Sequence, residues 1–256
     1  MLRWRIATAL ILAPVVLGAL LLGRWTVLAL VLVVVALAAY ELSQALNPLP
    51  FTAALGAGVF PVILTVPFGA AGVLGGVVLV LPWTLFWLAA RPEARTLRAL
   101  LALMLMALWV GAPMAMAALI VRAEDGVILI LIAVVGPWVS DSGAYFAGRL
   151  FGRHSMFPTL SPKKTIEGGL GGLVLTMGAV GVVGYYALGL SPLQAALAGA
   201  VISVFSQSGD LFESLLKRMM EIKDLGNTLP GHGGMLDRID SLLFTAPAVY
   251  YVFLLI

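Results

Sequence analysis

Cysteine is absent from this chain of 256 residues, histidine occurs only twice, and charged residues make up only 11% of the sequence. The lack of cysteine excludes disulfides, thiolate metal sites and cysteine nucleophiles. The lack of charge excludes an ordinary soluble domain, because a soluble surface of this size needs far more charged side chains to stay dispersed. A metal site, if present, is expected to use carboxylates instead of clustered histidines.

Hydrophobic residues are abundant instead, at 62% of the chain, with a mean hydropathy of +1.09. Apolar runs long enough to cross a bilayer recur along the sequence. They predict an all-α, polytopic integral membrane protein with about nine transmembrane helices, at residues 6–22, 25–46, 51–67, 69–90, 97–121, 127–147, 168–189, 193–213 and 239–256.

The distribution of basic residues predicts the orientation. If the N-terminus is cytoplasmic, nine spans leave only Arg24 and Arg122, of 15 Lys and Arg residues, on the outer face. This asymmetry is typical of membrane proteins, whose basic loops stay in the cytoplasm, and it explains the net charge of +3 without a nucleic-acid partner. We therefore expect the two large basic loops to lie on the cytoplasmic side of the membrane.

Polar residues divide the chain into two expected regions. Residues 1–126 predict N-terminal scaffold helices, because these spans hold few polar side chains. Residues 127–256 predict a C-terminal catalytic region with two basic cytoplasmic loops, at 148–167 and 214–238.

Asp141 lies in an apolar run beside Ser140, Ser142 and Tyr145. A carboxylate in lipid is costly, so Asp141 must face a partner or water. One interpretation is a carboxylate at a helix end near the interface. The interpretation we favour is the wall of a polar cavity.

The first basic loop carries Arg149, Arg153, Lys163 and Lys164 before the glycine-rich start of the seventh span. Cations and exposed backbone N–H groups at a helix start can bind phosphate. A cytoplasmic retention signal is the alternative. Ser161-Pro162 and the glycines at 168, 169, 171 and 172 favour a functional site, because charge retention needs no special backbone geometry.

The eighth span has a polar stripe, on which Asp210, Ser214 and Lys217 are spaced to share one helical face. A proton or ion pathway would use a similar stripe.

The loop after the eighth span contains Lys223 and a Pro-Gly-His-Gly-Gly turn, whose glycines allow close approach to an anion. Asp237, Arg238 and Asp240 follow, and on a helix the two aspartates would face Asp210. Carboxylates gathered near cations favour Mg²⁺ carrying a substrate's phosphates.

These motifs resemble one family. SLLKRMMEIKDLGNTLPGHGGMLDRID, at 214–240, is similar throughout to the signature of phosphatidate cytidylyltransferases (CDP-diglyceride synthases). DSGAYFAGRLFG at 141–152, SPKKTIEGG at 161–169 and SQSGDLFES at 206–214 resemble further blocks of that family in its order. The N-terminal half is similar only in hydropathy. Ile166 departs from the aromatic residue expected after Lys-Lys-Thr, which affects a local packing contact.

The resemblance implies Mg²⁺-dependent transfer of the cytidylyl group of CTP to phosphatidate, with CDP-diacylglycerol and pyrophosphate as products. For this reaction our hypothesis assigns Asp210 and Asp237 to the metal, with Asp240 and Asp141 as further ligands or supporting groups; a second cation stays open. Ser214 and His232 would line the site. The expected phosphate-binding residues are Lys163, Lys164, Lys217, Arg218, Lys223 and Arg238.

Two alternatives stay open. A CTP-dependent polyprenol or lipid kinase would use similar phosphate-binding parts and release CDP. An ion-coupled transporter could use Asp141 and Asp210 as a relay, although the sequence shows no inverted repeat. The expected partners of the enzyme are CTP, phosphatidate and membrane lipids, and small-residue helix faces permit a homodimer.

Overall fold

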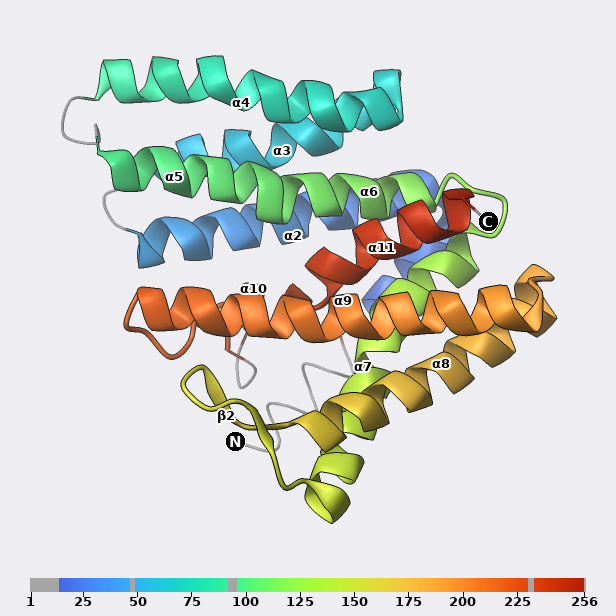
Figure 1. The fold of residues 1–256 in the computed structure, drawn as a ribbon. Helices are drawn as coiled ribbons and strands as arrows, with labels where there is room; N and C mark the ends of the chain where they lie inside the picture. Colours follow the sequence, from blue (N-terminus) through green and yellow to red (C-terminus); the bar gives the residue numbers. More distant parts are fainter. Residues whose placement is uncertain (1–13, 47–48, 92–95, 230–232, 256) are drawn as a thin grey trace. The chain divides into compact units, whose positions relative to one another are not determined.

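The structure is a computed structural model that describes residues 14–46, 49–91, 96–229 and 233–255. It is all-α apart from one short hairpin, and seven of its described helices are long and apolar enough to cross a membrane (Figure 1). The predicted all-α, polytopic class is confirmed. Large apolar side chains cover the exposed helix faces, including Leu74 and Leu85 on one helix and Val174 and Tyr186 on another. Such faces suit contact with lipid tails.

The chain folds into two compact units. Unit 1 contains residues 1–123 and 223–239, and unit 2 contains residues 124–222 and 240–256. The sequence-based division at 126/127 stays a prediction. The second half of the second basic loop, residues 223–239, folds with the N-terminal helices.

Unit 1 consists of α2 (Arg24–Ala45), α3 (Phe51–Phe68), α4 (Ala70–Ala90), α5 (Leu97–Leu105), a π-helical turn η2 (Met106–Gly111), α6 (Ala112–Ile120) and the short α10 (Leu236–Ile239). Helix α3 packs along α4, where Gly72 and Gly76 let the two backbones approach closely. The Trp83 indole donates a hydrogen bond to the Ala53 carbonyl across this pair, at 2.9 Å. The predicted span at 97–121 is α5, η2 and α6 in sequence.

Unit 2 consists of α7 (Gly126–Phe151), strands β1 (Ser155–Phe157) and β2 (Ser161–Thr165), α8 (Ile166–Leu188), α9 (Pro192–Met219) and α11 (Leu242–Leu255). The two strands pair antiparallel within the loop that joins α7 to α8 (Figure 1). Ser191 and Gln194 form a reciprocal capping box that starts α9. Helix α11 packs on α9 and α7, and the Thr245 hydroxyl donates to the Ala133 carbonyl at 2.8 Å.

The expected count of nine spans is not confirmed. Residues 6–13 of the first predicted span lie outside the described residues, and its remaining residues, 14–22, are helical. The last predicted span, 239–256, is interrupted by a turn at Asp240-Ser241, and α11 has 14 residues. At a rise of about 1.5 Å per residue such a helix is about 21 Å long, shorter than the roughly 30 Å hydrocarbon core.

Glycines hold α7 and α8 together. A Cβ added at Gly172 would lie 2.7 Å from the Ser140 carbonyl oxygen, and one at Gly143 would lie 2.8 Å from the Gly171 carbonyl oxygen. A Cβ at Gly171 would overlap the Cβ of Ala147. In the sequence, the glycines at 168–172 favoured a phosphate site. The structure corrects this for Gly171 and Gly172, which serve helix packing.

Substitution of Gly171 by alanine should therefore destabilise unit 2. We expect Gly171→Ala to lower the free energy of unfolding by about 1–3 kcal/mol, because the added methyl has no space. Gly178→Ala, on the same helix with nothing within 4 Å of the added Cβ, is the matched control and should be neutral or slightly stabilising. Thermal unfolding in detergent measures both, and equal shifts would contradict the packing role.

Candidate functional site

An ion pair between Lys164 and Asp210 lies at the centre of the predicted site residues in unit 2. The Lys164 Nζ atom is 2.5 Å from the Asp210 Oδ2 atom, and each side chain keeps about a third of its surface exposed. Lys164 is on β2 and Asp210 on α9, so the hairpin brings the first basic loop to the polar stripe of the eighth span. Lys163, the neighbouring residue on β2, is exposed. Neighbouring residues of a strand point to opposite faces, which separates the two lysines.

The turn that carries Asp240 lies against α9, beside Asp210. A Cβ added at Gly209 would lie 2.6 Å from the Asp240 carbonyl oxygen and 2.9 Å from the Ser241 Cα atom, so only glycine allows this approach. Asp240 interacts electrostatically with Asp210, Asp141 and Lys217. Three of the predicted acidic residues thus lie near one another and near Lys164: Asp141 from α7, Asp210 from α9 and Asp240 from the turn before α11.

The cytoplasmic end predicted for α9 carries a second ion pair. The Lys217 Nζ atom is 2.7 Å from the Glu213 Oε2 atom, one helical turn away, and the Glu213 side chain is almost completely buried. Ser214 is half-buried and Arg218 is exposed on the same helix. Glu213, three residues after Asp210 on the same helix, was not predicted as a site residue. Its place beneath Lys217 limits the positions that the Lys217 ammonium can reach.

Polar contacts inside unit 2 continue the stripe toward the middle of α9. The hydroxyls of Ser203 and Ser140 are 3.0 Å apart and buried. The Gln207 amide donates to the Ser203 hydroxyl at 3.1 Å and to the Gly169 carbonyl at 3.2 Å. These bonds join α9 to α7 and α8 and so fix the helix from which Asp210 projects.

Glu167, in the first turn of α8, anchors the β hairpin. Its Oε2 atom accepts hydrogen bonds from the backbone N–H groups of Arg153 and His154, at 3.1 and 3.3 Å. Its Oε1 atom is 2.6 Å from the His154 Nδ1 atom. The Thr165 hydroxyl caps the same helix by accepting from the Gly168 N–H at 3.1 Å. The start of α8 is therefore occupied by protein groups, and Lys164 is held where the strand meets the helix.

The remaining predicted residues belong to unit 1. Asp237 lies in α10, and its Oδ2 atom accepts from the Gly234 N–H at 2.9 Å. Arg238 and Lys223 are exposed. His232 lies outside the described residues. The expectation of one helix through Asp237 and Asp240 is wrong, because α10 ends at Ile239 and Asp240 lies in the following turn.

Glu41 on α2 is a residue that sequence reasoning missed. It is 1% exposed and accepts hydrogen bonds from three residues of the second basic loop. The sequence contained a signal for Glu41, because a carboxyl group in an apolar span is costly and needs a partner, as was argued for Asp141. The first spans were instead taken as featureless scaffold.

The described side chains do not form a complete metal site by themselves. Within the described ranges, no group of three or more His, Asp or Glu side chains lies close enough to hold a metal ion. The available donors are carboxylate oxygens, which suit Mg²⁺. Mg²⁺ is commonly held by one or two carboxylates with water and substrate phosphates. Asp210 with Asp240 or Asp141 fits this mode, and a complete protein cage does not.

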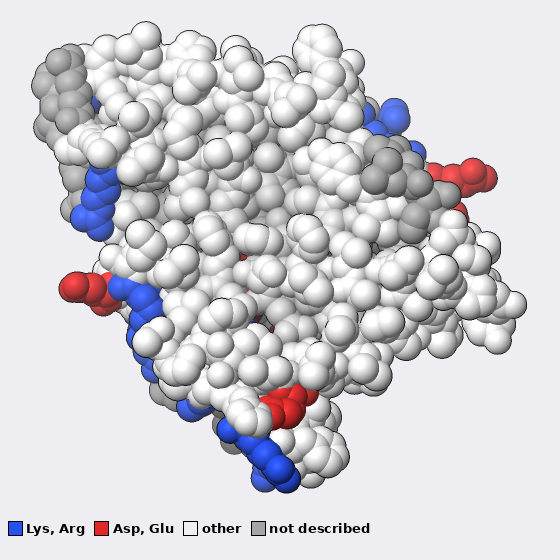
Figure 2. All heavy atoms as spheres, in the orientation of Figure 1, with Lys and Arg blue, Asp and Glu red and all other residues white. Residues whose placement is uncertain are grey.

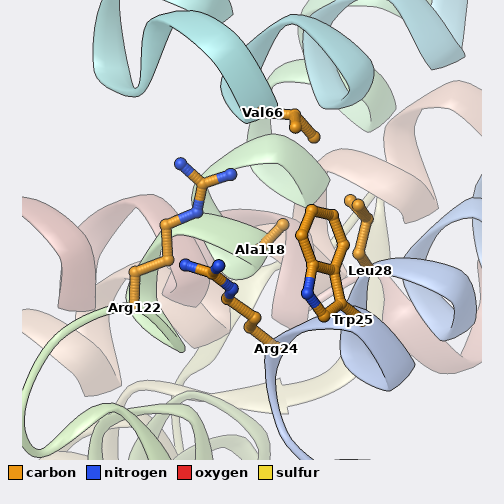
Figure 3. A pocket seen from close by; sticks show the side chains of 6 residues that line it. All are labelled: Arg24, Trp25, Leu28, Val66, Ala118 and Arg122. Carbon is orange, nitrogen blue, oxygen red and sulfur yellow. The ribbon is translucent and has the colours of Figure 1, made fainter.

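A pocket of about 80 Å³ in unit 1 is lined by residues outside the predicted site (Figure 3). Its lining includes Arg24 and Arg122, the two basic residues expected on the outer face. Arg122 donates to the Thr65 carbonyl at 2.8 Å, and the Arg24 guanidinium lies 5.0 Å from the centre of the Trp25 ring. These contacts give both arginines a structural role at helix ends.

Charged side chains are sparse on the molecular surface. In Figure 2 most of the visible surface carries neither acidic nor basic residues. The fold and this surface define the class of the protein, an all-α polytopic membrane protein with few charged groups on its visible surface.

The chain belongs to the cytidylyltransferase family, whose family model matches residues 3–256. It is similar to the phosphatidate cytidylyltransferase of Mycobacterium bovis, with 38% identity over 224 residues that cover 81% of this chain and 72% of the relative. It is also similar to the phosphatidate cytidylyltransferase of Bacillus subtilis, with 44% identity over 130 residues, 50% of this chain and 48% of the relative. The uncharacterized protein YnbB of Escherichia coli is 42% identical over 128 residues, 50% of this chain and 43% of the relative. The likeness thus extends beyond the C-terminal motifs.

Removal of the Glu167 carboxyl group should release the hairpin. We expect Glu167→Ala to raise the rate of trypsin cleavage after Arg153, Lys163 or Lys164 by about tenfold, because two backbone hydrogen bonds to a charged group are lost. Limited proteolysis followed by mass spectrometry measures the rate. Glu124→Ala, at an exposed position, is the control. Equal cleavage rates in the two variants would contradict the anchoring role.

Proposed function

We propose that this protein transfers the cytidylyl group of CTP to phosphatidate and forms CDP-diacylglycerol and pyrophosphate. The observation that carries the proposal is the gathering of Lys164, Asp210 and Asp240 in unit 2, within a chain that matches the cytidylyltransferase family over almost its whole length. The names of the M. bovis and B. subtilis relatives supply the lipid substrate.

The reaction needs little from a general base. A phosphate oxygen of phosphatidate attacks the α-phosphorus of CTP, a new P–O–P bond forms, and the bond to the bridging oxygen of the leaving pyrophosphate breaks. The phosphomonoester is already largely a dianion at neutral pH, because its second pKa is about 6. The protein must therefore bring two polyanions together in line and stabilise the charge that develops on pyrophosphate.

Basic side chains supply that stabilisation. In the proposed complex Lys164 and Lys217 exchange their carboxylate partners in part for substrate phosphates, and Lys163 and Arg218 extend the positive surface. Lys223 and Arg238 in unit 1 would bind further phosphate oxygens, and Ser214 and His232 would line the site. The ion pairs at 2.5 and 2.7 Å support this, because they hold two ammonium groups near the acidic cluster before substrate binds.

Carboxylates would hold the metal. We assign Asp210 and Asp237 as the main Mg²⁺ ligands and Asp240 and Asp141 as further ligands or as groups that orient them. Bound Mg²⁺ would neutralise charge on the phosphates of CTP. A second cation remains compatible with four carboxylates.

The location of the substrates sets the orientation. CTP is soluble and the acyl chains of phosphatidate stay in the bilayer, so the site is proposed to open to the cytoplasm and sideways to lipid. Its membrane would be the bacterial cytoplasmic (inner) membrane, which agrees with the bacterial relatives. Glycines with open space beside them, such as Gly178 and Gly181, leave room for a homodimer.

Asp210→Asn and Asp237→Asn should each lower kcat by about 100-fold or more, because each removes a charge that the metal–phosphate assembly needs. The protein should stay folded and membrane-inserted. Asp125→Asn, at an exposed aspartate that makes no side-chain cap, is the matched control and should keep full activity. Near-normal turnover in either test variant would remove that aspartate from the site.

The products decide the reaction type. Purified protein given CTP, Mg²⁺ and phosphatidate should form pyrophosphate and a CDP-lipid in equal amounts, and both should disappear when Mg²⁺ is removed by a chelator. Release of CDP with a phosphorylated lipid would instead establish a kinase. No consumption of CTP by a folded preparation would favour a transporter.

A further inference from the structure

Glu41 is the only acidic residue of α2. The stretch before it, residues 27–39, is entirely apolar, and hydrophobic residues on both sides of Glu41 such as Val35, Ala38 and Leu42 are completely buried. A carboxyl group at 1% exposure in such surroundings needs several hydrogen bonds to offset the loss of water. The structure provides these bonds from one segment, which is remote in sequence.

The donors belong to residues 228–236. The Glu41 Oε1 atom accepts from the Thr228 hydroxyl and from the Met235 N–H, the latter at 2.6 Å. The Oε2 atom accepts from the Leu236 N–H at 2.9 Å. Both carboxyl oxygens are therefore used to hold the backbone of the segment that the family signature occupies.

Two glycines shape the segment around Glu41. A Cβ added at Gly226 would lie 2.5 Å from the Glu41 Cγ and Cδ atoms, and one at Gly234 would lie 2.8 Å from its Oε2 atom. Larger residues at either position would push the carboxyl group away. From the sequence, the glycines of the Pro-Gly-His-Gly-Gly turn, which include Gly234, were expected to allow the approach of a ligand anion. At Gly226 and Gly234 the group that approaches is Glu41.

The contacts of Glu41 lead directly to Asp237. Met235 and Leu236, whose N–H groups bind Glu41, immediately precede Asp237 in the chain. The Gly234 N–H donates to Asp237 Oδ2 at 2.9 Å, and a Cβ at Gly234 would meet both carboxyl groups at 2.8 Å. Residues 234–237 are thus held by the carboxyl groups of Glu41 and Asp237. Glu41 fixes the start of α10, because it binds the N–H group of Leu236, the first residue of that helix.

We propose that Glu41 is a positioning residue, which holds residues 226–229 and 233–237 in the conformation that presents Asp237 and Arg238 to the substrates. It acts through the loop and touches no substrate itself. The catalytic consequence rests on the proposed function. The effect on the loop does not, so the two can be tested separately.

The first test measures the loop directly by hydrogen–deuterium exchange with mass spectrometry on the purified full chain in detergent. Glu41→Gln keeps the size of the side chain but places an NH₂ donor against a donor of the loop, whichever way the amide turns. We expect the amides of Met235 and Leu236 to exchange about tenfold faster or more. Ser43→Ala is the matched control, because Ser43 is also buried on α2 but its hydroxyl donates to the Tyr40 carbonyl of its own helix.

The second test separates positioning from general stability by kinetics. Glu41→Gln should lower kcat by about 10- to 100-fold, the range found when groups that orient metal ligands are removed, and should raise the Mg²⁺ concentration needed for half-maximal rate. The KM for CTP should change by less than the fall in kcat. Ser43→Ala should leave all three unchanged.

Thr228→Val provides a variant that should fold even if Glu41→Gln does not, because Thr228 lies in a half-exposed loop. It removes one of the three donors and should give a smaller loss of kcat in the same direction. In the double variant with Glu41→Gln it should add little, because both changes break the same contact.

The outcomes are distinct. Unchanged exchange in Glu41→Gln, or full kcat in a variant whose loop exchanges faster, would overturn the positioning role. Additive losses in the double variant would do the same. If the wild-type protein forms no CDP-lipid, the proposed function fails, and the exchange measurement alone decides whether Glu41 orders the loop.

Discussion

The cost of placing a carboxyl group in apolar surroundings governs the arrangement of this protein. Each deeply placed acid is matched by particular partners: Glu41 by backbone N–H groups and a hydroxyl, and Glu213 by Lys217. The half-exposed Asp210 is matched by Lys164. Several of these partners come from a loop and from the hairpin. The hydrogen bonds and ion pairs that stabilise the carboxyl groups therefore also order the segments that carry the basic residues. The same contacts therefore stabilise the chain and assemble its chemistry.

The family signature at 214–240 is continuous in sequence but is shared between the two compact units. Residues 214–219 form the end of α9, residues 220–222 follow it in unit 2, and residues 223–239 belong to unit 1 with α2. The chain returns to unit 2 at Asp240, whose turn packs closely against Gly209 of α9. Each unit thus orders its own acidic residues by internal contacts, with Asp210 and Asp240 in one and Asp237 in the other.

Periodicity and motif spacing predicted the helical class and most of the spans. They also singled out acidic and basic residues that the structure brings together in unit 2. They missed contacts that join distant segments. The hairpin at 155–165 lay inside what resembled a basic loop, and the α10–turn–α11 break replaced a continuous apolar run. Glu41 was missed because its partners lie 187 to 195 residues away in the sequence. Gly171 and Gly172 were assigned to phosphate, since sequence alone does not distinguish close packing from ligand approach.

The central claim is that the α-phosphorus of CTP moves to the lipid. The most direct measurement supplies phosphatidate and Mg²⁺ with CTP radiolabelled at either the α or the γ phosphorus, and follows the label after lipid extraction. The account predicts that the α label appears in the lipid and the γ label only in pyrophosphate. Transfer of the γ label to the lipid would contradict it.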